Sequence, residues 1–135
     1  MTATEPSRGT RQAGIDKMVE VYGFAVDPEQ IPGDFVDETV DHLFAQVWGD
    51  GALNIRDRRL LTIGVLAGLG QPKLLEIQFS SALSKNELTI DQARKLVVHL
   101  AHYVGWPLAT SVNEALETVI ARQVAQEDSA GGSDQ

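Results

Sequence analysis

The sequence of 135 residues contains no cysteine, and this absence removes a large group of functions. Disulfide bonds, zinc–thiolate sites, iron–sulfur clusters and thiol redox catalysis all require cysteine side chains. The sequence also lacks a run of about eighteen apolar residues, so no segment is expected to span a membrane. Residues 1–14 lack the apolar stretch of a secretory signal, which predicts a cytoplasmic protein.

Positive charge is scarce relative to negative charge. Eleven Lys and Arg residues stand against nineteen Asp and Glu residues, for a formal net charge of −8. A surface with this balance is repelled by a phosphate backbone and by anionic lipid. We therefore expect no nucleic-acid partner and no membrane partner.

The length and the 43% hydrophobic content suit one globular domain. Residues 1–14 and the acidic, Gly/Ser-rich residues 126–135 show no apolar period, so both ends are predicted to be disordered. Residues 15–125 then form a single folded domain.

Apolar residues within this domain recur at helical spacing, between capping residues, Gly and Pro. The pattern predicts an all-α, compact bundle of about six helices. The expected helices cover residues 15–22, 34–47, 55–69, 72–85, 90–104 and a last segment that begins near 107. Thr89 and Gln92 have the spacing of a capping box, and Asn54 is the expected N-cap of the third helix.

The third predicted helix is unusual because residues 60–70 carry no charge and are apolar on every side. Such a helix is expected to be buried all round. Gly64 and Gly68 lie inside it, and each costs about 1 kcal/mol relative to Ala in a helix interior, which predicts a close backbone neighbour. One small domain cannot easily surround this helix, so we expect contacts between subunits to help cover it.

Arg56, Arg58 and Arg59 occupy the first turn of that helix, where free N–H groups already make the potential positive. One interpretation is an anion site that binds a carboxylate or an enolate. The alternative is a structural ion pair with Asp57, Asp50 or a carboxylate of another subunit.

His99 and His102 lie three residues apart on the fifth predicted helix, with Lys95 one turn earlier and Tyr103 beside them. Histidines suit acid–base catalysis near neutral pH. The alternative is a pair of partly buried histidines that bond to backbone or to a neighbouring subunit. His42 is predicted to be a solvated or capping residue.

A metal site could only combine His99 and His102 with a carboxylate such as Glu76. The sequence has three histidines and neither a Glu-x-x-His nor a His-x-x-x-His pair, so we expect no metal. No other cofactor is expected.

From Phe35 to about Arg122, the sequence resembles the carboxymuconolactone decarboxylase family, which is related to the alkylhydroperoxidase D fold. The resemblance lies in the order and spacing of four pieces: Trp48-Gly49, residues 53–60, Ala82-Leu83 with Leu88-Thr89, and residues 101–107 (AHYVGWP). It implies an all-α domain that forms homotrimers or homohexamers, with sites between helices and often at subunit borders. The peroxidase branch of the family uses a Cys-x-x-Cys pair, so this chain resembles that branch in fold but not in activity.

The decarboxylase branch implies a cofactor-free lyase with an arginine-rich helix start and a histidine on the following helix. Arg56 and Arg58 match the arginine element, but Gln78 stands at the position of the histidine. An amide does not exchange protons at neutral pH, so His99, His102 or Glu76 would have to replace that histidine.

The leading hypothesis is therefore a cofactor-independent lyase or isomerase that acts on a small carboxylate, lactone or carbonyl substrate. Arg56 or Arg58 would bind the carboxylate, and His99 or His102 would transfer the proton. The remaining candidate substrate-binding residues are Glu76, Gln78, Tyr103 and Trp106. The alternative is a non-catalytic module on the same fold that binds a small metabolite or mediates oligomerisation.

Overall fold

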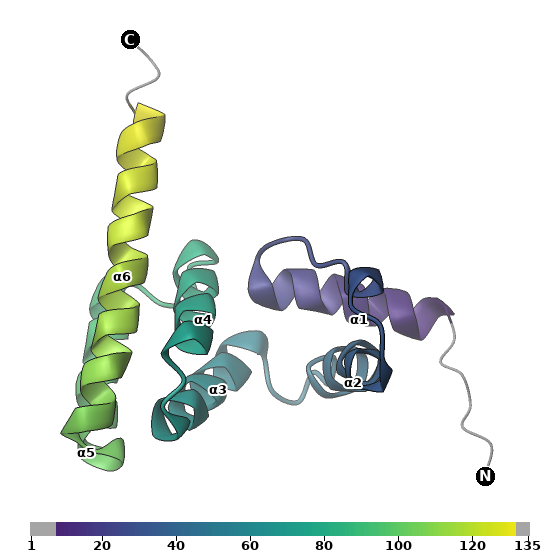
Figure 1. Ribbon diagram of the computed structural model, residues 1–135, viewed down its shortest axis with the longest axis horizontal. Coiled ribbons are helices and arrows are strands. Elements are labelled where there is room, and N and C mark those ends of the chain that lie inside the picture. Colours follow the sequence, from purple (N-terminus) through teal and green to yellow (C-terminus); the bar gives the residue numbers. More distant parts are fainter. Residues whose placement is uncertain (1–7, 132–135) are drawn as a thin grey trace. The chain divides into compact units, whose positions relative to one another are not determined.

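The computed structural model describes residues 8–131, and in this range the chain is entirely helical apart from its turns (Figure 1). The prediction of an all-α fold is confirmed. The elements are α1 (Arg8–Tyr22), the 3₁₀ turn η1 (Pro28–Gln30), α2 (Asp34–Glu38), the π-helix η2 (Thr39–Val47), α3 (Ile55–Leu69), α4 (Pro72–Ser84), α5 (Ile90–Val104) and α6 (Trp106–Gly131).

The helices at both ends extend beyond the bounds that the sequence predicts. Residues 8–14 belong to α1 and residues 126–131 belong to α6, although both stretches lie in segments expected to be disordered. The rest of those segments, residues 1–7 and 132–135, lies outside the described residues. Tertiary contacts explain the early start of α1, because Arg11 pairs with Asp37 and Asp41, each at 3.2 Å, and Gly14 packs against Val40.

The chain divides into two units, residues 1–58 and residues 59–135. In the first unit, α1 packs on η2 around a core of Met18, Val21, Val40 and Phe44. The helices approach so closely at Gly14 that an added Cβ would collide with the carbonyl oxygen of Val40. Residues 34–47 are helical as predicted, but the Trp48 N–H bonds to the carbonyl of Leu43, five residues back, which is the π-helical pattern.

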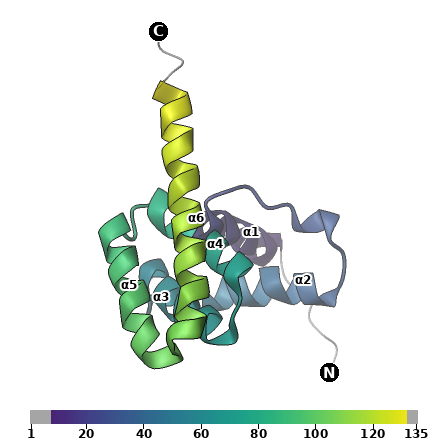
Figure 2. The same cartoon turned by 60° about the vertical axis from the view of Figure 1, so that its left-hand side comes forward.

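In the second unit, α4 and α5 both pack against α6, whose C-terminal part (yellow) extends beyond them (Figure 2). Their apolar faces form one core that includes Leu75, Phe79 and Leu116. Thr89 and Gln92 form the capping box of α5, as predicted. Asn86, in the turn that follows α4, adopts the left-handed conformation with a φ of 57°.

Helix α3 is not buried all round, which corrects the expectation from its apolar composition. Ile63 and Ala67 are fully buried, but Leu61, Val65 and Leu69 are 62%, 60% and 67% exposed. The expected close backbone neighbour is also absent within residues 8–131. The nearest atoms to a Cβ on Gly64 or Gly68 are side-chain carbons of Leu100 and Val104, at 4.0 and 3.9 Å.

In the described part of the chain, no helix has both the length and the apolar character needed to cross a membrane.

Candidate functional site

Arg59 is the most buried charged residue among those that the structure describes, with 1% of its surface exposed. Its Nε lies 2.7 Å from Oε1 of Glu87 and its Nη2 lies 3.0 Å from Oε2, so the guanidinium fork meets both carboxylate oxygens. The Glu87 side chain is itself only 13% exposed. For Arg59, the structural ion pair is therefore the correct interpretation, although the partner is none of the acids considered from the sequence.

Gln78 belongs to the same buried network. Nη1 of Arg59 donates to Oε1 of Gln78 at 2.9 Å, and Gln78 is 8% exposed. The network joins α3, α4 and the turn before α5. Gln78 lies on the buried face of α4 with Leu75, Phe79 and Ala82, and its amide oxygen is engaged by a charge that Glu87 neutralises. This arrangement gives Gln78 a structural role in the core.

Arg56 and Arg58 lie in the unit of residues 1–58. Arg58 donates from Nε to the carbonyl of Leu53 at 3.2 Å and from Nη2 to the carbonyl of Asp50 at 2.9 Å. It therefore holds the loop that precedes α3 in place. Arg56 is exposed on the first turn, which Asn54 caps as predicted by accepting the Asp57 N–H at 2.8 Å.

His102 lies near the C-terminal end of α5 with an exposed imidazole. Its Nδ1 lies 2.8 Å from the carbonyl oxygen of Val98, four residues earlier. A carbonyl oxygen only accepts hydrogen bonds, so Nδ1 carries the proton in this contact. In the neutral ring, Nε2 then has the free lone pair and can act as a base.

Trp106 and Tyr103 provide the aromatic neighbours of the two histidines. The rings of His102 and Trp106 meet edge to face, with centroids 5.7 Å apart and planes at 79°. The rings of His99 and Tyr103 are tilted by 34°, with centroids 4.9 Å apart. Tyr103 is 78% exposed and Trp106 is 64% exposed. These four residues, three from α5 and Trp106 from the start of α6, are called the α5 aromatic face, and both of its histidines are exposed.

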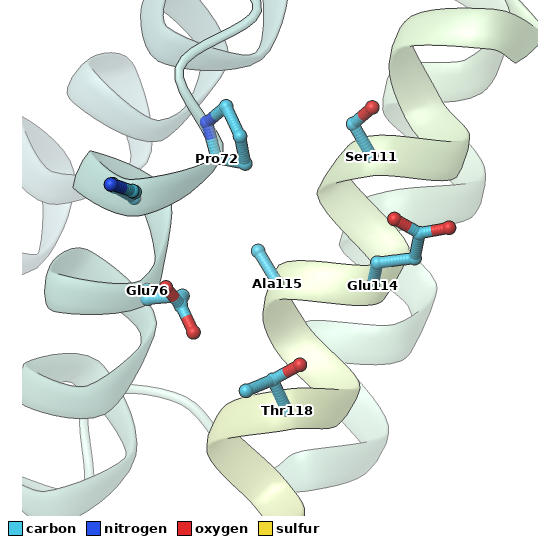
Figure 3. A pocket seen from close by; sticks show the side chains of 7 residues that line it. Pro72, Glu76, Ser111, Glu114, Ala115 and Thr118 are labelled. Atoms are coloured by element: carbon cyan, nitrogen blue, oxygen red, sulfur yellow. The ribbon is translucent and has the colours of Figure 1, made fainter.

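Glu76 is the remaining predicted site residue. It extends from α4 into a shallow cleft of about 210 Å³ between α4 and α6 (Figure 3), and Nη2 of Arg122 lies 3.3 Å from its Oε1. Lys73, Ser111, Glu114 and Thr118 are among the residues that line this cleft. The cleft is open, and both polar and apolar atoms line it. Across residues 8–131, no group of three His, Asp or Glu side chains is placed to hold a metal ion.

The predicted site residues thus fall into four places in the chain. Arg56 and Arg58 stand at the start of α3, Gln78 is in the buried network, Glu76 lines the cleft, and the α5 aromatic face gathers His99, His102, Tyr103 and Trp106. Sequence reasoning missed Glu87, which lies 28 residues from Arg59. Its isolated position after Asn86 offers no spacing signal for this pairing.

Comparison with known proteins gives one result. The family model described as "Carboxymuconolactone decarboxylase family" matches residues 33–118, which is more than half of the chain. No match was found among curated proteins or among solved structures.

Proposed function

Because the chain belongs to the carboxymuconolactone decarboxylase family, we propose that it is a cofactor-independent lyase or isomerase in which His102 transfers the proton. The proposed substrate is a small carboxylate, lactone or carbonyl compound. One observation carries the proposal: the hydrogen bond from Nδ1 of His102 to the carbonyl of Val98 leaves Nε2 as an exposed acceptor.

The chemistry that this geometry supports is proton transfer at carbon next to a carbonyl group. As an isomerase, Nε2 of His102 would take a proton from that carbon, and the electron pair would form an enolate. The imidazolium would then return the proton to a different carbon. As a lyase, loss of CO₂ from the substrate carboxylate would leave the enolate. His102, protonated beforehand at Nε2 by solvent, would then supply the proton that completes the product.

The other predicted residues take different parts in this proposal. Gln78 is bound to Arg59 and does not transfer protons, so it does not replace His102. Arg56 and Arg58 stay candidates for binding the substrate carboxylate, and His99 stays a candidate second acid. Thiol peroxidase chemistry is not available to a sequence without cysteine.

The test is a screen of small carboxylic acids, lactones and β-keto acids, followed by ¹H NMR. The proposal expects conversion of at least one compound, with a loss of about 100-fold or more in His102→Asn. His42→Asn is the matched control, because His42 is exposed and, among residues 8–131, its imidazole bonds only to Gln46, through Nδ1 at 3.1 Å. Equal turnover by both variants would reject His102 as the proton-transfer group.

A non-catalytic small-metabolite-binding or oligomeric interaction module is the second candidate. The observation in its favour is that Arg59 binds both Gln78 and Glu87 in the core. Such a module would bind a compound from the same screen without converting it. Ligand at 100 times its Kd would still raise the free energy of unfolding by about 2.7 kcal/mol, which thermal-shift measurements detect.

We further propose that the chain assembles as a homotrimer or homohexamer in the cytoplasm. Support comes from α3, where Leu61, Val65 and Leu69 form an exposed apolar stripe at i, i+4 and i+8. Sedimentation velocity tests this proposal. Val65→Lys should reduce the mass of the assembly, and an unchanged mass would place the contact elsewhere.

A further inference from the structure

The turn between α5 and α6 places Trp106 against His102. Gly105 joins the two helices with a φ of +94°, a conformation that residues with a Cβ rarely adopt. Trp106 follows directly as the first residue of α6, four residues after His102. The backbone conformation at Gly105 therefore sets the position of the Trp106 side chain relative to α5. The indole ring meets the imidazole of His102 edge to face.

Two contacts then act on one imidazole. The hydrogen bond to Val98 fixes Nδ1, and the indole of Trp106 contacts the ring from α6. A histidine on an exposed helix face otherwise samples several rotamers. His99 shows the contrast, because its imidazole contacts the ring of Tyr103 but makes no hydrogen bond within the described residues.

We propose that Trp106 is a positioning residue that holds His102 in the rotamer and tautomer in which Nε2 is presented as the base. This inference rests on the function proposed for His102. A general base works only when its lone pair points at the proton to be removed, so the restraint matters for the rate of the chemical step. Trp106 itself needs no contact with the reacting atoms.

The first test reads the imidazole directly and needs no substrate. In protein labelled with ¹⁵N-histidine, the nitrogen shifts of His102 should report a protonated Nδ1 in the wild type and in Trp106→Phe. Trp106→Ala should give a mixture of tautomers. Tyr103→Ala is the matched control, because it removes an exposed ring that contacts His99 and should leave the His102 signals unchanged. Unchanged His102 signals in Trp106→Ala would overturn the proposal.

The second test is kinetic. Trp106→Ala should lower kcat by about tenfold to a hundredfold with little change in KM, and Trp106→Phe should restore most of the rate. A raised KM at constant kcat would make Trp106 a substrate contact and would overturn the positioning role. If the His102 signals move in Trp106→Ala while His102→Asn retains full turnover, the restraint on the ring is supported and the proton-transfer role of His102 is rejected.

Discussion

Loss of the carboxylate of Glu87 should destabilise the protein severely. In Glu87→Gln the positive charge of Arg59 stays in the core, 1% exposed, without the carboxylate that neutralises it. The amide also turns one donor towards a guanidinium that has only donors. Breaking a buried ion pair by removing one partner costs about 3–5 kcal/mol, because the remaining charge is uncompensated.

The chain contains a matched control for this substitution. Arg94 and Glu117 form a pair with the same two contacts, Nε to Oε1 at 2.9 Å and Nη2 to Oε2 at 3.0 Å. Their side chains are 53% and 41% exposed, so water replaces the lost partner. The two pairs differ in burial rather than in geometry, and Glu117→Gln should therefore change stability by only a small fraction of the effect of Glu87→Gln.

Thermal unfolding followed by circular dichroism measures both variants. At roughly 4 °C per kcal/mol for a chain of this size, Glu87→Gln should lower Tm by roughly 12–20 °C. The double variant Arg59→Met/Glu87→Leu should recover much of this loss, since an apolar replacement removes both charges. Equal Tm changes in Glu87→Gln and Glu117→Gln would refute the argument that burial decides the cost.

Three further predictions concern other parts of the chain. Gly14→Ala should cost about 1–3 kcal/mol by pushing α1 away from η2, whereas Gly51→Ala, which has no atom within 4 Å of the new Cβ, should be neutral in urea denaturation. Arg58→Ala should cost about 1–2 kcal/mol through the lost bonds to the loop carbonyls; loss of activity at unchanged stability would instead support carboxylate binding. The hydrogen bond from Arg94 holds the pKa of Glu117 below its ordinary value of 4.5, so this pair stabilises the fold above that pH. The difference in Tm between the wild type and Glu117→Gln should shrink as the pH falls through the folded-state pKa, and a difference that grows would contradict this sign.

Features encoded by neighbouring residues could be predicted from the sequence. The capping box at Thr89, the N-cap at Asn54 and the start of α6 around Pro107 are all as expected. Each depends on contacts within one helical turn, which spacing reveals. The resemblance to the carboxymuconolactone decarboxylase family, which rests on the order and spacing of four short sequence pieces, is also confirmed.

Features that depend on distant contacts could not be predicted in this way. Arg59 pairs with Glu87, which lies 28 residues later in the chain. Residues 8–14 are helical because α1 packs against η2. Apolarity alone suggested a fully buried α3, but that expectation depended on what the rest of the chain places nearby. The hydrogen bond of His102 is local, yet side-chain rotamers are not visible in a sequence pattern.

The central claim is that Nε2 of His102 exchanges protons with carbon, and hydrogen–deuterium exchange measures this step directly. A compound that the protein binds is incubated in D₂O with wild type, His102→Asn or His42→Asn, and its signal next to the carbonyl is followed by ¹H NMR. The account predicts that wild type and His42→Asn replace this proton with deuterium and that His102→Asn does not. Two results would contradict the account. One is exchange that persists in His102→Asn, and the other is that the wild type exchanges this proton in none of the compounds it binds.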